Sequence, residues 1–369
     1  MKIGILTVPF NNNYGGVLQA YALKCIITQL GHDVVFINRR RDPNTSFKYR
    51  IYKTLVKLGV IEDYLKIQTQ KISVHFERFI EEYLFPLTEP YYSTNDIKKC
   101  LNLNIDCFIV GSDQVWRYKY AEKSLQNYFF DFLNGSNLPR FSYAASFGID
   151  ELDYPINVIN KIRNSLRQFS AISVREKSGV SLLENIGINT DDIKVVLDPT
   201  LLLTSKHYSS LINQTDDNIK NILFTYVLDE KLVNSGALAD YVKENKLGIV
   251  DIKAQVGKIS QQTVLEPVEK WLASIKNAKY VITDSFHGTV FSIIFNKPFL
   301  VLANPMRGTT RLTGMLSSFG LENRIVYKLE DAESIKEMFD KAINWNEVNK
   351  IIEKQRQESL TFIKQNLKI

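Results

Sequence analysis

The side chains best suited to chemistry lie in the short turn Asp284–Gly288, with the sequence Asp-Ser-Phe-His-Gly. A β-rich run precedes this turn and an apolar helix, Thr289–Phe295, follows it. Open α/β sheets bind ligands at such strand-to-helix junctions, where free N–H groups and the helix dipole favour anions. We therefore expect Ser285, His287 and Gly288 to contact an anionic ligand. The alternative is that Asp284 or Ser285 only caps the helix and that His287 is an incidental loop residue.

Two loops in the first half of the chain provide a second group of candidates. The turn Asn11–Gly16 follows a predicted strand, and its two glycines would let a ligand approach the backbone closely. Its spacing differs from the dinucleotide fingerprint Gly-x-Gly-x-x-Gly. The loop Gly111–Trp116 also follows a strand and carries Ser, Asp, Gln and Trp. The candidate binding residues of both loops are Tyr14, Gly15, Gly16, Asp113, Gln114 and Trp116. For Trp116, packing beneath its loop is the alternative.

Three arginines could supply positive charge to a ligand. Arg175 ends a predicted strand, where a guanidinium can hold a carboxylate or phosphate through two parallel hydrogen bonds. Glu176 or another acid could instead pair with it as a structural partner. Arg307 lies in the loop after a later strand, and Arg311 lies on the helix predicted to follow that loop.

Strands and helices alternate through both halves of the chain, which is typical of parallel, doubly wound sheets. We predict an α/β fold of two Rossmann-like domains whose strand ends face each other across a cleft. The first domain is expected at 1–168, with a helical insertion at about 42–104, and the second at 169–344, before a C-terminal helix at 345–369. Polar strand ends on both sides of one cleft favour an enzyme with two substrates.

The composition narrows the class of protein. The chain has 369 residues, of which 45% are hydrophobic and 23% charged, as in soluble globular proteins. No stretch is long and apolar enough to span a membrane, and the first residues do not resemble a signal peptide. The cysteines Cys25, Cys100 and Cys107 form an odd count without metal-like spacing. We therefore expect a cytoplasmic protein with reduced thiols and no metal site.

The formal net charge of +6 is concentrated in one segment. Seven Lys or Arg residues and one Asp lie between Arg39 and Lys57, so the rest of the chain is formally neutral. The cations alternate with apolar and aromatic residues, which would suit contact with anionic lipid headgroups. A solvated basic helix is the alternative. Nucleic acid is not expected as a partner, because no recognised binding motif accompanies the segment.

Five motifs follow one another along the chain: Asn13–Leu23, Val110–Trp116, Ile172–Glu176, Leu197–Thr200 and Asp284–Gly288. Together they resemble the polysaccharide pyruvyl transferase family over about residues 1–330. The resemblance implies a fold like that of the two-domain GT-B glycosyltransferases. It also implies transfer of the enolpyruvyl carbon of phosphoenolpyruvate onto two hydroxyls of a sugar, which gives a pyruvate ketal and phosphate without a further cofactor.

The resemblance also assigns roles to individual residues. In that family the Arg of the strand-end motif and the His of the His-Gly motif contact phosphoenolpyruvate, which points to Arg175 and His287. Better-known members have an Arg two residues before the His, where this chain has Ser285. The missing charge would then come from Arg307 or Arg311.

The resulting hypothesis places the donor in the second domain and the acceptor in the first. Arg175 would hold one anionic group of the donor, and the turn around His287 would hold the other. His287 is the candidate general acid and Asp113 the candidate base. The acceptor would be a sugar of a cell-surface polysaccharide precursor, such as that of a capsule or exopolysaccharide. If the basic segment binds membrane, this precursor would be lipid-linked at the inner face of the membrane.

Two other functions fit the same residues. One is a GT-B glycosyltransferase that uses a nucleotide sugar, for which Glu266 or Glu269 could contact the ribose. The other is a sugar-binding member of the family without catalytic activity, which the loss of the family Arg at Ser285 leaves open.

Overall fold

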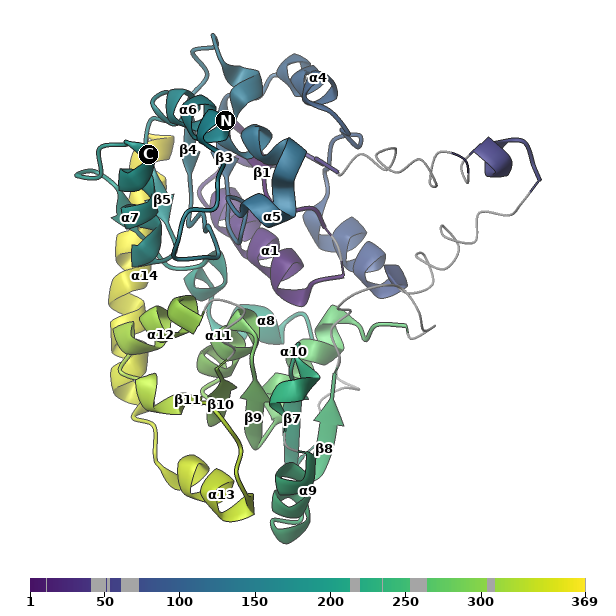
Figure 1. The fold of residues 1–369 in the computed structure, drawn as a ribbon, viewed down its shortest axis with the longest axis vertical. Helices are drawn as coiled ribbons and strands as arrows, with labels where there is room; N and C mark the ends of the chain where they lie inside the picture. Colours follow the sequence, from purple (N-terminus) through teal and green to yellow (C-terminus); the bar gives the residue numbers. More distant parts are fainter. Residues whose placement is uncertain are drawn as a thin grey trace.

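The computed structural model contains two large parallel β-sheets surrounded by helices, as predicted, together with a two-stranded sheet (Figure 1). It describes residues 1–10, 12–40, 51, 54–60, 73–212, 220–233, 235–252, 264–303 and 309–368. Over these ranges, no helix is long and apolar enough to cross a membrane.

The first sheet has the strand order β2-β1-β3-β4, with every neighbouring pair parallel. Its strands are β1 (Lys2–Leu6), β2 (Asp33–Phe36), β3 (Cys107–Val110) and β4 (Arg140–Ser142). Helix α1 (Tyr14–Gln29) connects β1 to β2. The helix begins earlier than the sequence pattern indicates because the Asn13 side chain caps it by accepting a hydrogen bond from Gly16 N. The N–H of Gly16 is therefore used by this cap.

Short helices surround the first sheet. In the described part of the predicted insertion they are a π-helix at Ile80–Leu84, α4 (Thr94–Ile97) and a 3₁₀ helix at Lys98–Leu103. Further along the chain are α5 (Tyr118–Ala121), 3₁₀ helices at Glu122–Phe129 and Asp131–Leu133, α6 (Ile156–Leu166) and α7 (Lys177–Ile186). Helix α7 ends at Gly187, whose φ of +86° is the left-handed conformation that glycine adopts most easily.

The predicted boundary at residue 168 does not separate the two sheets. Strand β5 (Ser173–Val174) pairs with β6 (Lys194–Val195), and parallel bridges also join Phe141 to Ala171 and Ala145 to Val174. These bridges attach β5 to the end of β4. The strand that leads into Arg175 therefore lies beside the first sheet, although the predicted boundary at residue 168 assigns it to the second domain.

The second sheet has the order β11-β10-β9-β7-β8 and is also parallel. Its strands are β7 (Ile222–Tyr226), β8 (Gly248–Asp251), β9 (Tyr280–Thr283), β10 (Phe299–Leu302) and β11 (Ile325–Val326). Its α-helices are α9 (Ser235–Glu244), α10 (Val268–Asn277), α11 (Phe286–Ile294), α12 (Thr309–Ser318) and α13 (Ala332–Asp340). This part also contains 3₁₀ helices at Pro199–Leu202, Glu230–Leu232 and Glu322–Arg324 and the short helix α8 (Ser205–Ser209).

One hydrophobic core is shared by the two halves. Tyr14 of α1 stacks on Trp271 of α10, with ring centroids 5.2 Å apart, and Trp271 also meets Phe291 of α11 at 5.3 Å. The long C-terminal helix α14 (Trp345–Leu367) runs alongside both halves in Figure 1. Its Phe362 packs against Phe141 of the first sheet. The halves therefore meet through packed side chains, and α14 ties the second half back to the first.

The predicted basic segment lies largely outside the described residues. Arg39, its first cation, is buried, with 6% of its surface exposed, and its Nε donates a hydrogen bond to Asn127 Oδ1. Arg40 and Lys57 are exposed. Arg39 is therefore part of the protein interior and cannot contact a membrane in this structure.

Candidate functional site

Arg175 lies at the centre of a cluster of buried charges. It directly follows β5, and only 2% of its side chain is exposed. Its Nη1 is 2.9 Å from Asp198 Oδ2 and 3.5 Å from Asp113 Oδ1, and its Nε is 3.4 Å from Glu176 Oε2. Burial by itself would lower the pKa of the guanidinium, but the three carboxylates outweigh it and raise that pKa. The acidic structural partner considered as an alternative for Arg175 is therefore present.

The third guanidinium nitrogen of Arg175 makes no contact with these carboxylates. Nη2 is buried and has no hydrogen-bond partner among the described residues. The guanidinium carbon lies 4.1 Å from the ring centroid of Phe286, so an aromatic face covers the group without satisfying its N–H donors. A buried donor without a partner is costly. Nη2 is thus suited to receive an oxygen atom from a bound ligand.

Asp198 holds Arg175 and His287 close to each other. Its Oδ1 accepts hydrogen bonds from the N and Oγ1 of Thr200, at 3.0 and 2.7 Å. Its Oδ2 is 2.9 Å from Arg175 Nη1 and 3.6 Å from His287 Nε2. Burial alone would raise the pKa of this carboxyl, but the neighbouring His287 and Arg175 hold it below its usual range. Asp198 is therefore an ionised link between the end of β5 and the start of α11.

The imidazole of His287 occupies the space beside Gly15. His287 is the second residue of α11 and is 6% exposed. A Cβ atom built on Gly15 would lie 1.9 Å from His287 Nδ1 and 2.2 Å from Cγ. Because Gly15 is the second residue of α1, the amino ends of α1 and α11 meet at this ring. Gly15 was predicted to bind the acceptor, but it packs against His287, which was predicted to bind the donor. The two residues therefore belong to the same site.

Asp113 enters the cluster from the loop after β3. Its φ of +66° lies in the left-handed region that residues other than glycine seldom adopt. Its carbonyl accepts hydrogen bonds from the N–H groups of Val115 and Ser146, at 2.8 and 3.0 Å, which hold this conformation. Backbone strain of this kind is concentrated at functional sites. The loop brings the Asp113 carboxylate to Arg175 instead of to solvent.

Arg311 is a second arginine near the cluster. It lies on α12, and its pKa is lowered by burial and then by the charge of Arg175, while Glu176 and Asp113 act in the opposite direction. Arg311 is therefore close enough to the cluster for its charges to influence this pKa. Arg307, the other cation expected from the sequence, lies outside the described residues.

The predicted contact of Trp116 with the acceptor is not compatible with the structure. Its side chain is 0% exposed and stacks on Phe129, with ring centroids 5.0 Å apart. Its Nε1 donates a hydrogen bond to Tyr128 O at 3.0 Å. Trp116 therefore packs beneath its loop, which was the alternative interpretation.

Tyr14 and Gln114 are also engaged inside the protein. Tyr14 is 1% exposed, and its hydroxyl donates a hydrogen bond to Glu266 O at 2.9 Å. Gln114 Oε1 accepts a hydrogen bond from Arg117 at 2.7 Å, and a Cβ on Gly148 would lie 2.2 Å from that oxygen. Tyr14 therefore joins the two halves, and Gln114 shapes its own loop. The Tyr14 hydroxyl is therefore not free for an acceptor, whereas Gln114 is half-buried and only its Oε1 is engaged by these contacts.

Ser285 and Gly288 form the cap of α11. Ser285 Oγ accepts a hydrogen bond from Gly288 N at 3.4 Å, which confirms the alternative that Ser285 caps the helix. A Cβ on Gly288 would lie 2.4 Å from Thr283 Oγ1, so glycine is needed for the helix to approach β9. The carboxylate of Asp284 accepts hydrogen bonds from the backbone N–H groups of residues 228 and 229. Asp284 therefore fixes the loop after β7 and does not face the cluster through those oxygens.

The charges of the cluster nearly balance. The carboxylates of Asp113, Glu176 and Asp198 face Arg175, Arg311 and the ionisable His287. An anion would consequently be held by directed N–H donors and helix amino ends more than by excess positive charge. Within the described ranges, no group of three or more His, Cys, Asp or Glu side chains could hold a metal ion.

Asp198 and Phe286 were not among the predicted site residues. Asp198 ends a strand-like run and precedes Pro199. Arg175 was a candidate because it follows a predicted strand directly, and the same reasoning applies to Asp198. The role of Phe286 as a cover for the guanidinium depends on contacts between distant parts of the chain. No local pattern indicates it.

Solved structures with low sequence identity share the fold. UDP-GlcNAc 2-epimerase of Methanocaldococcus jannaschii, in complex with UDP-GlcNAc and UDP, is 13% identical, with 96% of this chain and 99% of that chain covered and a TM-score of 0.53. The S. aureus MnaA–UDP co-structure is 11% identical, with 100% and 97% covered and a TM-score of 0.56. Arabidopsis thaliana UGT89C1 complexed with UDP-L-rhamnose is 10% identical, with 98% of both chains covered and a TM-score of 0.51. The expected GT-B fold is confirmed.

The sequence itself matches a family model. None of the curated proteins compared with this chain matches it. The model described as polysaccharide pyruvyl transferase matches residues 13–305, which is most of the chain and includes every residue of the charged cluster described above except Arg311. The chain belongs to the polysaccharide pyruvyl transferase family.

Proposed function

We propose that this transferase moves the enolpyruvyl group of phosphoenolpyruvate onto two hydroxyls of a sugar. The two oxygens of the acceptor become bonded to the former enol carbon, and the bond from that carbon to the phosphate oxygen breaks. Of the two protons that the hydroxyls lose, one is balanced by the proton that converts the methylene carbon into a methyl group, and the other leaves with the phosphate. The observation that best supports this donor is the buried Nη2 of Arg175, which lacks a partner among the described residues although three carboxylates surround the same guanidinium.

The donor would bind where the two halves of the protein meet. Arg175 Nη2 would hold one of its two anionic groups. The other would lie at the amino ends of α1 and α11, beside Gly15 and His287, where helix dipoles favour negative charge. Arg311 would add charge from α12. This arrangement keeps the carboxylate and the phosphate apart, so that the enol carbon lies between Arg175 and His287.

His287 is the proposed general acid for the methylene carbon. Asp198 lies 3.6 Å from its Nε2, and Gly15 closes the other side of the ring, so the imidazole has little freedom to turn. Asp113 is the proposed base for an attacking hydroxyl, because its carboxylate lies beside Arg175 and its loop is held in one conformation. Asp198 is a positioning residue in this scheme, since it orients Arg175 and His287 without contacting the donor.

The proposed acceptor is a sugar of a cell-surface polysaccharide precursor. A lipid-linked precursor at the inner face of the membrane remains part of this proposal, with Arg40 and Lys57 as described cations of the basic segment. Co-sedimentation with anionic vesicles at low salt tests the membrane contact. Absence of binding would remove the segment as an anchor and would leave the transfer reaction unaffected.

A product assay tests the reaction. The protein is incubated with phosphoenolpyruvate and a panel of oligosaccharides, and phosphate release and the mass of each saccharide are followed together. We expect one pyruvate ketal for each phosphate released, and turnover at least about 100-fold slower in His287→Gln. Near-normal turnover of His287→Gln would contradict its role as the acid. Transfer of a sugar from a UDP-sugar, the type of ligand bound in the solved structures with this fold, would favour a glycosyltransferase instead.

A further inference from the structure

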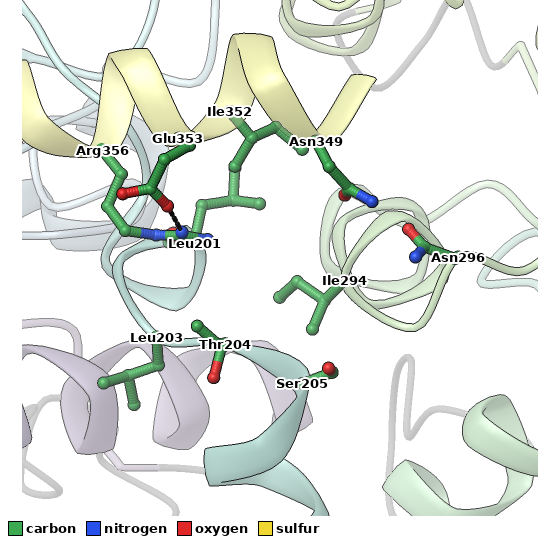
Figure 2. A pocket seen from close by; sticks show the side chains of 10 residues that line it. All are labelled: Leu201, Leu203, Thr204, Ser205, Ile294, Asn296, Asn349, Ile352, Glu353 and Arg356. Carbon is green, nitrogen blue, oxygen red and sulfur yellow. Dashed lines mark hydrogen bonds and ion pairs between the residues drawn. The ribbon is translucent and has the colours of Figure 1, made fainter. Parts of the chain in front are cut away.

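A pocket separate from the charged cluster lies at the other end of α11 (Figure 2). Its volume is about 230 Å³. It lies where α14 passes over the end of α11 and over the connection between the 3₁₀ helix Pro199–Leu202 and α8. The residues that line it are Leu201, Leu203, Thr204, Ser205, Ile294, Asn296, Asn349, Ile352, Glu353 and Arg356.

The lining combines an apolar floor with a neutral polar rim. The apolar part consists of the buried Leu201, Leu203 and Ile352 and the half-buried Ile294. The rim carries the amides of Asn296 and Asn349, which lie on the same side of the pocket in Figure 2, and the hydroxyl of Ser205. Both asparagines are exposed, and neither amide has a hydrogen-bond partner among the described residues. Glu353 and Arg356 form an ion pair with each other, so they leave no unpaired charge for a ligand.

We propose that this pocket binds one neutral sugar ring. The volume corresponds to about eight water molecules at roughly 30 Å³ each, and it is below the roughly 300 Å³ at which pockets for drug-sized ligands begin. A sugar ring fits the lining because its hydroxyls can both donate to and accept from asparagine amides, while its C–H face can rest on the aliphatic floor. Nucleotides and acidic sugars do not fit, because the only charged side chains in the lining neutralise each other.

A sugar in this pocket would touch two elements that also hold the charged cluster. Helix α11 carries His287 at its start and Ile294 at its end, about 10 Å apart along the axis. Leu201 lies three residues after Asp198, and its carbonyl accepts a hydrogen bond from Arg356 Nε at 2.8 Å. Occupancy of the pocket should therefore alter the affinity for the donor. This coupling rests on the proposed function, whereas sugar binding itself does not.

Saturation-transfer NMR of the full chain tests the binding. The probes are glucose, galactose, mannose and N-acetylglucosamine, with glucuronate and glucosamine as charged comparisons. We expect at least one neutral sugar to bind with a Kd on the order of 1 mM. Asn349→Phe should abolish that signal by filling the pocket, and Asn349→Ala should weaken binding about 3- to 10-fold by removing the amide. Lys354→Phe, an equally exposed change on α14 outside the lining, should leave binding unchanged.

Three outcomes would overturn the proposal. These are the absence of binding by every neutral sugar, binding that survives in Asn349→Phe, and equal binding of the charged sugars. A further variant, Arg175→Lys, separates this site from the donor site. Sugar binding that persists in Arg175→Lys but disappears in Asn349→Phe supports the pocket even if phosphoenolpyruvate does not bind the wild-type protein. In that case only the proposed function fails.

Discussion

Gly15→Ala should displace His287 from its place in the cluster. The added Cβ would lie 1.9 Å from Nδ1, whereas ordinary contacts begin near 3.4 Å, so the imidazole must retreat by about 1.5 Å. Alanine also favours the helical conformation of α1 by up to about 1 kcal/mol relative to glycine. Because overpacking costs about 1–3 kcal/mol, this gain offsets part of the cost and we expect a net loss of up to about 2 kcal/mol in the free energy of unfolding.

The same displacement should weaken donor binding. A shift of this size separates His287 from Asp198, now 3.6 Å from Nε2, and moves the imidazole away from the proposed donor position. The imidazole would then lose its proposed hydrogen bond to the charged donor. Such a bond is worth about 1.5–3 kcal/mol, which corresponds to about a 10- to 150-fold increase in the Kd for phosphoenolpyruvate. Titration calorimetry measures that Kd without a known acceptor.

A double-mutant cycle separates this contact from a general effect of the substitution. In a His287→Ala background the space beside Gly15 is open, so Gly15→Ala should no longer destabilise the protein. Gly314→Ala is a suitable control, because Gly314 lies in helix α12 and a Cβ there meets nothing within 4 Å. Urea denaturation gives the free energies of unfolding. The reasoning is refuted if Gly15→Ala destabilises the His287→Ala protein as much as the wild type, or if it leaves the Kd unchanged.

Two other substitutions test the cluster and its surroundings. Asp198→Asn should cost about 3–5 kcal/mol in urea denaturation at pH 7, because it leaves Arg175 buried beside a weaker partner. Since folding lowers the pKa of Asp198 below its unfolded value of about 3.9, this contribution is present above about pH 4 and is lost as the pH falls further. The stability difference between wild type and Asp198→Asn should therefore be constant from pH 7 to 5 and narrow near pH 3. A difference that grows in acid would contradict the conclusion that Asp198 is ionised in the folded protein. Trp116→Phe should cost about 1–3 kcal/mol of stability in thermal denaturation, because Tyr128 O loses the hydrogen bond from Trp116 Nε1. The Kd for phosphoenolpyruvate should not change. A higher Kd at unchanged stability would show that Trp116 contacts the ligand.

The sequence was a good guide where local chemistry decides the structure. Alternating strands and helices predicted both large parallel sheets. Arg175 and His287 were both expected at strand-to-helix junctions, and both are found there. These predictions succeed because a buried strand, a polar turn and a capped helix each leave a pattern within a few residues.

The sequence was a poor guide where distant segments meet. Strand β5 has only two residues, so nothing local indicates that it lies beside the first sheet. Trp116 and Tyr14 carry groups able to bind a ligand, but packing partners elsewhere in the chain bury them. The contact between Gly15 and His287 joins residues more than 270 positions apart, and only the assembled fold brings them together.

The most direct test of the account is a calorimetric titration of the wild-type protein and of Arg175→Lys with phosphoenolpyruvate. Lysine keeps a positive charge among the three carboxylates but lacks the forked guanidinium, including Nη2. The account predicts that phosphoenolpyruvate binds the wild type and that Arg175→Lys binds it at least about 10-fold more weakly. Equal binding by both proteins, or wild-type binding of UDP but not of phosphoenolpyruvate, would contradict it.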